Sequence, residues 1–319
     1  MHIPDGFLDA KTALVTTGLA VTGLGFALRQ VRRELPPRRV PLLGLSAAFL
    51  FVAQMVNFPV AGGTSGHLLG GALVAALLGP AAAIVVVATV LIVQCFLFAD
   101  GGLLALGANV FNMGLVATLS GYAIYRLAFR LLPGTRGRVA AIAFAGWCST
   151  VLAAISCAGQ LAWSGTVAWH VALPAMAGVH MLIGLGEGAI SALVLVAIAR
   201  TRPDLLEPAP ADQPPPDRLR GFVLLGLLAS VGVAVFVAPF ACPWPDGLDA
   251  VAAHLGFAGQ AAAPILPAPA PDYQMPGLGS PLFATAAVGV GGMLVVFALA
   301  ILFSRLLVRE PPTPKSPGP

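Results

Sequence analysis

Long apolar runs separated by short polar connections are the main feature of the chain. There are eight such runs, and most hold about the 20 residues that a helix needs to cross the roughly 30 Å hydrocarbon core of a bilayer. The pattern therefore predicts an all-α integral membrane protein. The runs are Leu8–Leu28, Pro41–Phe58, Leu68–Phe98, Gly107–Tyr125, Val139–Trp163, Leu173–Ala199, Phe222–Phe240 and Leu282–Phe303.

The third run is too long for a single crossing. Its residues, about 31 of them, would form a helix of about 46 Å. The pair Gly79-Pro80 interrupts the run, and such a pair typically ends one helix and starts the next. We therefore predict two short helices in this run and nine transmembrane helices in all.

The basic residues predict the orientation, because Lys and Arg collect in cytoplasmic connections. With nine crossings and the N-terminus outside, every basic residue except Lys11 falls in an inner segment. A single crossing for the third run would instead put four arginines on the outer face. We therefore predict an outer N-terminus and a cytoplasmic C-terminus. The inner segments are Arg29–Arg39, Arg126–Arg138, Arg200–Arg220 and Arg305–Lys315.

Composition excludes several classes of protein. Charged residues make up only 9% of the chain, against about 25% in a soluble domain, which excludes a soluble enzyme. The two lysines, Lys11 and Lys315, lie in no phosphate-loop pattern, so ATP hydrolysis by that device is not expected. Nor does any run combine basic residues with stacking aromatics, so no nucleic-acid partner is expected. We interpret the four cysteines, which form no CxxC pair, as buried apolar side chains.

The chain divides into two predicted modules. Residues 1–200 hold seven spans, and residues 201–220 form a polar, Pro-rich linker of the semi-rigid type. Residues 221–319 hold two more helices with an outer loop at 241–280 between them. The tail Pro311–Pro319 is predicted to be disordered from its composition.

The N-terminus offers a metal-binding chelate. The start lacks the basic segment of a secretory signal, so we expect Met1 to be the mature terminus. Its free amine, the deprotonated amide of His2 and Nδ1 of the His2 ring can close two adjacent chelate rings around one ion. A fourth nitrogen would complete a square-planar site of the kind that suits Ni²⁺ or Cu²⁺. Alternatively, His2 is a polar residue at a frayed terminus.

His67 is the candidate for the fourth nitrogen. It follows the glycine-rich stretch Gly62–Gly66, on the predicted outer side where Met1 also lies, and glycines allow close approach of the backbone. The alternative is a histidine at a helix start that bonds a carbonyl. On this basis the candidate metal ligands are Met1, His2 and His67.

Other polar residues in the apolar runs have structural or functional interpretations. His180 and Glu187 are seven residues apart, hence on one helix face, and could form an ion relay or a structural contact that packs the nearby glycines. Asn57, Asn109 and Asn112 could support a metal site or join helices. His170 and His254 lie in predicted outer loops and are interpreted as surface residues.

Four segments of the chain carry a distinctive pattern: Met1–Gly6, Gly63–Gly71, Gly107–Met113 and His180–Gly188. Together they resemble the CbiM/NikM substrate-capture components of energy-coupling-factor (ECF) transporters for cobalt and nickel. The resemblance covers residues 1 to about 200. In the second module, Pro245–Asp249 is similar to the PDGLE motif with Asp249 in place of the final Glu, and this module resembles the small CbiN/NikN component.

The resemblance implies a function and its partners. It implies an ion held by the Met1 amine, the amide and imidazole of His2, and the His67 imidazole. It also implies a membrane coupling protein of the CbiQ/NikQ type and two ATPase subunits of the CbiO/NikO type, in the cytoplasmic membrane of a bacterium. The chain itself would then be a transporter subunit and no enzyme, importing Ni²⁺ or Co²⁺ as its substrate.

Alternatives remain. A planar set of four nitrogens favours nickel, and the start Met1–Gly6 resembles the nickel branch, with cobalt for cobalamin synthesis as the other choice. A vitamin-binding ECF component would need an apolar pocket rich in aromatics, whereas only 8% of residues are aromatic. An ion-coupled secondary transporter would use Glu187 as its intramembrane carboxylate.

Overall fold

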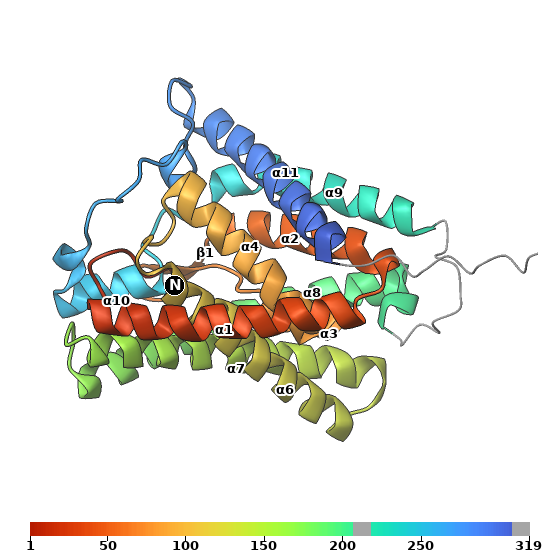
Figure 1. Cartoon of the computed structure of the whole chain (residues 1–319), viewed down its shortest axis with the longest axis horizontal. Helices are drawn as coiled ribbons and strands as arrows, with labels where there is room; N and C mark the ends of the chain where they lie inside the picture. Colours follow the sequence, from red (N-terminus) through yellow and green to blue (C-terminus); the bar gives the residue numbers. More distant parts are fainter. Residues whose placement is uncertain (207–217, 308–319) are drawn as a thin grey trace, which may run out of the picture.

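The computed structural model describes residues 1–206 and 218–307 as a helical bundle, in which some helices follow the long axis of the molecule and others cross it obliquely (Figure 1). A two-stranded antiparallel hairpin, β1–β2, is the only sheet within this part of the chain. The helices and strands are α1 Ala10–Glu34, α2 Val40–Met55, β1 Phe58–Val60, β2 Thr64–Gly66, α3 Gly71–Leu78, α4 Pro80–Phe98, α5 Leu106–Asn109, the π-helical segment η2 Val110–Val116, α6 Ala117–Leu131, α7 Gly134–Trp163, α8 Trp169–Thr201, α9 Arg218–Phe236, α10 Gly247–Leu255 and α11 Pro281–Leu307.

The apolar runs are helical as predicted, and the chain is a multi-pass membrane protein. In the described ranges, six helices are long and apolar enough to cross a bilayer: α1, α4, α7, α8, α9 and α11. The connections α1–α2 and α6–α7 lie at the end of the bundle away from the label N in Figure 1. The count of nine crossings and the direction of the chain across the membrane stay predictions.

The interruption predicted in the third run is confirmed. Helix α3 ends at Leu78 and α4 begins at Pro80, with Gly79 between them at φ 89° and ψ 159°. Only glycine adopts this backbone conformation without a steric penalty, and Pro80 suits the first turn of the new helix because its missing N–H is unpaired there in any case.

Helix α3 is too short to cross a membrane alone, since eight residues rise only about 12 Å. The chain before it, from Thr64 to Gly70, is fully buried although it is strand and extended backbone. Irregular backbone at membrane depth is tolerated where protein surrounds it and satisfies its polar groups. This buried extended segment was not predicted, and it carries His67 into the protein interior.

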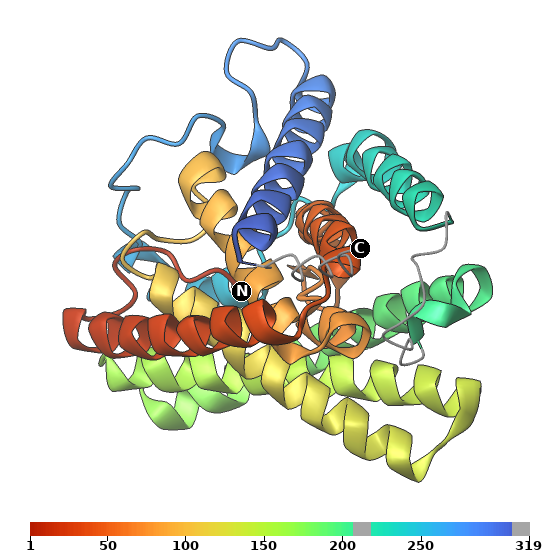
Figure 2. The same ribbon diagram turned by 45° about the vertical axis from the view of Figure 1, so that its right-hand side comes forward.

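Helix α4 forms the centre of the bundle and is buried along most of its length. On one side of it, α9 and α11 of the second module pack together against α2; on the other, α6, α7 and α8 form a layer (Figure 2). The most extensive helix pair is α7 with α8, joined at Gly146, Gly184 and Gly188, where a Cβ atom would meet the neighbouring helix.

The second module lies directly against the first. The segment that follows α9 contains α10 and short 3-10 turns at Ala258–Gln260 and Pro271–Tyr273, and it lies at the same end of the bundle as the N-terminus (Figure 1). The predicted linker 201–220 falls largely outside the described residues, as does the predicted tail Pro311–Pro319. The division into modules at residues 200 and 220 therefore stays a prediction.

Candidate metal-capture site

The N-terminal segment is held inside the protein. Met1 is 4% exposed and Ile3 is fully buried. The backbone of Ile3 makes two hydrogen bonds with the Asn109 side chain, its N–H donating over 2.8 Å and its carbonyl accepting over 3.1 Å. Gly102 N–H also donates to the Ile3 carbonyl. The terminus is thus fixed rather than frayed, and Asn109 supports the residue next to His2.

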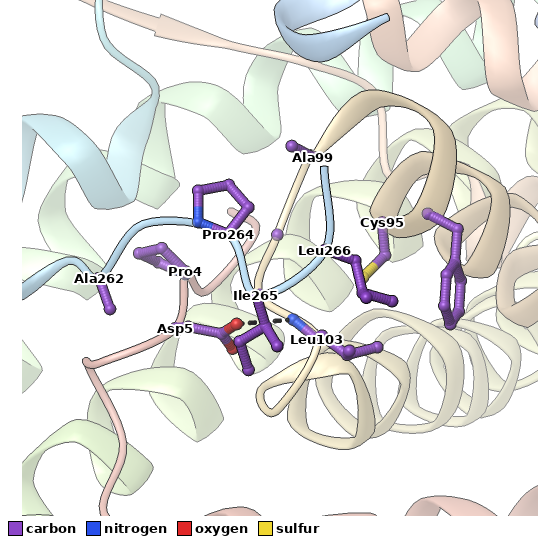
Figure 3. A pocket seen from close by; sticks show the side chains of 12 residues that line it. Pro4, Asp5, Cys95, Ala99, Leu103, Ala262, Pro264, Ile265 and Leu266 are labelled. Atoms are coloured by element: carbon purple, nitrogen blue, oxygen red, sulfur yellow. Dashed lines mark hydrogen bonds between the residues drawn. The ribbon is translucent and has the colours of Figure 1, made fainter. Parts of the chain in front are cut away.

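Asp5 anchors the next turn of the segment. Its carboxylate accepts hydrogen bonds from the backbone N–H groups of Leu103, Leu104 and Ala105, so it binds the loop that precedes α5. Its carbonyl accepts from Ala262 N–H of the second module over 2.7 Å. Figure 3 shows Asp5 between these two partners, beside a cavity of about 50 Å³ that Cys95 and Leu266 also line. Both modules therefore hold the N-terminal segment.

The amine of Met1 meets His67 in the interior. The Met1 nitrogen lies 2.9 Å from His67 Nε2, although 66 residues separate the two in sequence. The other ring nitrogen, Nδ1, lies 3.1 Å from the Leu68 carbonyl and donates to it. This bond places the ring proton on Nδ1, so the lone pair of Nε2 faces the amine.

His2 lies beside both of these nitrogens. Its ring centroid is 5.2 Å from that of His67, and its side chain is 7% exposed. Among the residues that the structure describes, Nδ1 of His2 has no hydrogen-bond partner although it is buried, and an Asp100 carboxylate oxygen lies 3.5 Å from it. A buried polar atom without a partner in a well-packed protein calls for an explanation, and Nδ1 is the atom that the predicted chelate requires.

The second module supplies a carboxylate that the sequence did not indicate as part of the site. Asp246 accepts a hydrogen bond from the charged Met1 amine over 2.5 Å. It is also the N-cap of α10, accepting from the N–H groups of Leu248 and Asp249. A Pro-Asp-Gly turn before an apolar run does predict a helix cap, but nothing in the sequence connects Asp246 with Met1.

A second contact from the same module was also missed. The hydroxyl of Tyr273 donates to Asp100 over 2.5 Å, and the other oxygen of Asp100 is the one that faces His2. The ring of Tyr273 stacks on Phe98, with 4.8 Å between the ring centroids. The loop at 241–280 of the second module therefore contacts the N-terminal site twice. Asp246 binds Met1, and Tyr273 binds the Asp100 carboxylate that lies beside His2.

Burial and charge together set the protonation of the site. Burial, reinforced by the positive amine, lowers the pKa of both His2 and His67 to about 3, so both imidazoles are neutral at pH 7. For Asp246, burial alone would raise the pKa, but the amine and the hydrogen bonds outweigh it and hold the pKa well below its usual range. Burial and then the charge of Asp246 raise the pKa of Asp249 to about 6.

His180 and Glu187 do not form a pair with each other. Nδ1 of His180 bonds the Met176 carbonyl over 2.8 Å, and the ring packs against Gly247 of the second module. The Glu187 carboxylate accepts from Leu69 N–H over 2.5 Å and Gly70 N–H over 2.9 Å. Glu187 thus satisfies the backbone of the buried extended segment, which is the structural contact foreseen as one alternative.

The remaining polar candidates have structural surroundings. Asn112 exchanges hydrogen bonds with Gln160 of α7 and so joins two helices. The Asn57 carbonyl accepts from Cys242 N–H and ties the modules together. His170 and His254 are exposed, as predicted, but they lie in the helices α8 and α10 and not in loops. The four cysteines are free; Cys157 is buried, and the other three are half-buried.

The arrangement brings three nitrogen donors close together: the Met1 amine, the His2 imidazole and the His67 imidazole. A small cavity of about 10 Å³ borders Met1, His67, His180 and Asp246. Among the described residues, no group of three His, Cys, Asp or Glu side chains is arranged to hold a metal ion. Metal binding here would therefore depend on the terminal amine, because the side chains alone do not form a ligand set.

Two family models match the chain. Residues 2–205 match the family model CbiM, "cobalt uptake substrate-specific transmembrane region", and residues 220–309 match the PDGLE domain. A putative fused nickel transport protein NikMN of Archaeoglobus fulgidus is 38% identical over 96% of this chain and 98% of its own. The fused nickel transport protein NikMN of Rhodobacter capsulatus is 35% identical over 75% of this chain and 72% of its own.

A solved structure resembles the first module. The crystal structure of a truncated transition metal transporter, 34% identical, matches with a TM-score of 0.58 and covers 63% of this chain and 99% of that one. The family match extends over most of the chain, and the buried N-terminal segment is at the centre of the site described above. The chain belongs to the CbiM family of substrate-specific membrane proteins for metal uptake, with a PDGLE domain fused at its C-terminal side.

Proposed function

We propose that the chain is the metal-capturing membrane component of an ECF transporter that imports Ni²⁺, and that the ion is held by four nitrogens. These are the Met1 amine, the deprotonated amide and Nδ1 of His2, and Nε2 of His67. The observation that carries the proposal is the approach of the Met1 amine to His67 Nε2, within 2.9 Å and beside the unpartnered Nδ1 of His2.

The ligand set follows from the chemistry of the terminus. The amine, the amide nitrogen and Nδ1 of a histidine at position 2 close a five-membered and a six-membered chelate ring. His67 supplies the fourth nitrogen, and the bond from its Nδ1 to Leu68 fixes the ring so that Nε2 is free to bind. Both imidazoles are neutral at pH 7, which is the form that binds metal.

Binding of the ion leaves the net charge of the site unchanged. In the metal-free protein the charged amine is paired with Asp246. On binding, the amine and the His2 amide each lose a proton, so Ni²⁺ together with the amide anion again carries one net positive charge. Asp246 therefore faces the same net charge before and after capture, and the pocket need not admit a further counter-ion.

The ligand type favours nickel over cobalt. A planar set of four nitrogens suits Ni²⁺, and the affinity of such sites generally rises from cobalt to nickel. The names of the fused relatives point the same way, because both quoted relatives are described as nickel transport proteins. Cobalt uptake is the second candidate, since the matched family model is described as a cobalt uptake region.

The energy for transport would come from other proteins. The chain has no phosphate-loop pattern, so the proposal includes a membrane coupling protein of the CbiQ/NikQ type and two ATPases of the CbiO/NikO type. The complex would work in the cytoplasmic membrane, with the end that carries Met1 outward. ATP hydrolysis in the partners would reorient the bundle and release the ion inward.

The experiment that tests the proposal is calorimetric titration of the purified full chain with Ni²⁺ and with Co²⁺. A matched variant carries one extra residue before Met1, which removes the chelate geometry of the terminus but keeps both imidazoles. We expect tight binding to the native chain and a loss of more than about 100-fold in the extended chain, since changes at outer partners alone cost about 10–100-fold.

Two side-chain variants complete the test. His67→Gln should weaken binding as strongly as the extension does, whereas His254→Gln, at an exposed position, should leave it unchanged. Equal binding by the native and extended chains would show that the ion binds elsewhere. Absence of Ni²⁺ and Co²⁺ binding to the native chain would refute metal capture itself.

A further inference from the structure

We propose that Tyr273 of the second module is a positioning residue for metal capture, and that it holds the Asp100 carboxylate beside the nitrogen of His2 that would bind the ion. The inference rests on the proposed function and adds to it, because it gives the fused module a part in the charge that surrounds the ion. The hydroxyl of Tyr273 would fix the Asp100 carboxylate where its negative charge stabilises a cation bound at Nδ1 of His2.

The three groups form a chain of contacts in which each Asp100 oxygen has its own partner. Oδ2 accepts the Tyr273 hydroxyl over 2.5 Å, and Oδ1 lies 3.5 Å from Nδ1 of His2. Asp100 cannot turn toward another partner without breaking its bond with Tyr273. The carboxylate is therefore fixed at the edge of the imidazole that would bind the ion.

Asp100 is half-buried, with 26% of its side chain exposed. Within residues 1–206 and 218–307, no arginine or lysine forms an ion pair with it, and the imidazole of His2 beside it is neutral at pH 7. A divalent cation bound at Nδ1 of His2 would place a positive charge next to this carboxylate, so the position of Asp100 suits the loaded state of the protein.

Tyr273 is held rigidly enough to position another group. Its ring stacks on Phe98 at an interplanar angle of 13°, and Phe51 lies on a further side with 6.2 Å between centroids. Ala270 N–H, three residues earlier, donates to the Leu97 carbonyl at the end of α4. The loop is therefore fastened to the same helix end that carries Asp100.

The backbone at Asp272 and Tyr273 is strained, which supports a functional role for this turn. Asp272 and Tyr273 both have positive φ, 52° and 57°, in the left-handed region that side chains other than glycine and asparagine rarely adopt. Such strain persists only where the surrounding contacts enforce it, and it is concentrated at functional sites. Here the strained conformation places the Tyr273 hydroxyl within hydrogen-bond distance of Asp100.

The test is Ni²⁺ titration of the full chain with its native terminus, comparing Tyr273→Phe, Asp100→Asn and the double variant. Phenylalanine keeps the ring stack on Phe98 and removes only the hydroxyl. We expect each single change to weaken Ni²⁺ binding about 10–100-fold, the usual effect of losing an outer partner of a metal site. The ligand-field absorption band of the bound Ni²⁺ should shift in both variants.

The double variant decides whether Tyr273 acts through Asp100. It should bind Ni²⁺ no more weakly than Asp100→Asn alone, because the two changes then remove one interaction. Tyr122→Phe is the control, since the Tyr122 hydroxyl lies in α6 and bonds only the exposed Arg126. It should leave both the affinity and the absorption band unchanged.

The outcomes separate this inference from the function on which it rests. Native affinity and an unshifted band in Tyr273→Phe would overturn the positioning role, as would independent, additive losses in the double variant. A lowered thermal stability with an unshifted band would show a merely structural role and overturn it too. Failure of the native chain to bind Ni²⁺ would refute the proposed function first, and the positioning role with it.

Discussion

The charged and buried amine of Met1 forms an ion pair with the partly buried Asp246, at 2.5 Å and across 245 residues of sequence. The pair joins the first residue of the metal-capture module to the cap of α10 in the second module. The amine that we propose as a metal ligand is thus neutralised within the protein while no ion is bound. We therefore expect metal binding to depend on the proton that the amine carries, and protein stability to depend on the charge of Asp246.

Binding of Ni²⁺ is expected to release about two protons at pH 7, one from the Met1 amine and one from the His2 amide. The imidazoles contribute none, because the pKa of His2 and of His67 is about 3 and both rings are already neutral. Affinity should therefore rise with pH, by about two powers of ten per pH unit. Titration calorimetry in buffers of different ionisation enthalpy measures the proton count, and a count near zero would contradict the proposed ligands.

Replacement of Asp246 should affect stability more than metal affinity. Asp246→Asn leaves a buried amine without its counter-ion, which typically costs about 3–5 kcal/mol, while the amide can still cap α10. Asp246→Ala should cost about 1 kcal/mol more, because the cap is lost too. Since the net charge beside Asp246 is the same with and without the ion, we expect Ni²⁺ affinity at fixed pH to change less than tenfold.

Thermal unfolding in detergent and Ni²⁺ titration check this expectation side by side. Asp249→Asn is the matched control, because it removes one negative charge from the same helix without touching the amine, and its backbone N–H can still bond Asp246. A loss of Ni²⁺ affinity beyond 100-fold in Asp246→Asn, with unchanged unfolding, would mean that Asp246 is itself a ligand.

Glu187 is expected to act as a support for His67 and not as an ion relay. Glu187→Ala would leave the buried N–H groups of Leu69 and Gly70 unpaired, at about 1–3 kcal/mol each, and so lower stability and Ni²⁺ affinity together. Glu187→Gln keeps an acceptor oxygen and should keep most of the transport activity. Thermal unfolding and cellular Ni²⁺ uptake measure the two effects, with Glu34→Gln, at an exposed position, as control.

The secondary-transporter alternative makes the opposite prediction for the same variants. If Glu187 couples ion movement, Glu187→Gln would abolish uptake while Ni²⁺ binding and thermal unfolding stay as in the native chain. That result would contradict the structural role that we assign to this carboxylate.

The contact between α7 and α8 should tolerate no added methyl group at Gly188. A Cβ atom there would lie 2.5 Å from the Ala143 carbonyl oxygen, so Gly188→Ala should cost about 1–3 kcal/mol by overpacking. Gly178 lies on the same helix, and nothing is within 4 Å of a Cβ atom at that position. Gly178→Ala should leave stability unchanged or raise it by up to about 1 kcal/mol.

Thermal unfolding of the two variants in the same detergent measures the difference. Equal melting temperatures for Gly188→Ala and Gly178→Ala would mean that the helices can separate at this point, which would contradict the close packing described above.

The helices and the break at Gly79 could be predicted because both depend on local sequence. Apolar runs of about 20 residues have few alternatives to a membrane helix, and a Gly-Pro pair is a strong stop signal. The strands β1 and β2 and the π-helical segment Val110–Val116 were not foreseen. They are too short to leave a periodic pattern, and their geometry depends on the neighbours that pack around them.

The site was predictable only as far as its chemistry is local. Met1 and His2 are adjacent, so their chelate could be drawn from the sequence, and the glycines before His67 indicated a close approach. Asp246, Asp100 and Tyr273 were missed because each reaches the site through tertiary contacts across long stretches of chain. The same holds for Glu187, whose partners Leu69 and Gly70 are more than 100 residues away.

The ion pair between Met1 and Asp246 also bears on how the protein is made. Met1 pairs with a residue that is translated 245 residues later, and such distant contacts form slowly because a long loop of chain must close. During synthesis the amine can face His67 but not yet its counter-ion. The pair between Met1 and Asp246 can therefore form only after translation has passed the PDGLE segment. A chain truncated before residue 246 would bury the charged amine without its counter-ion.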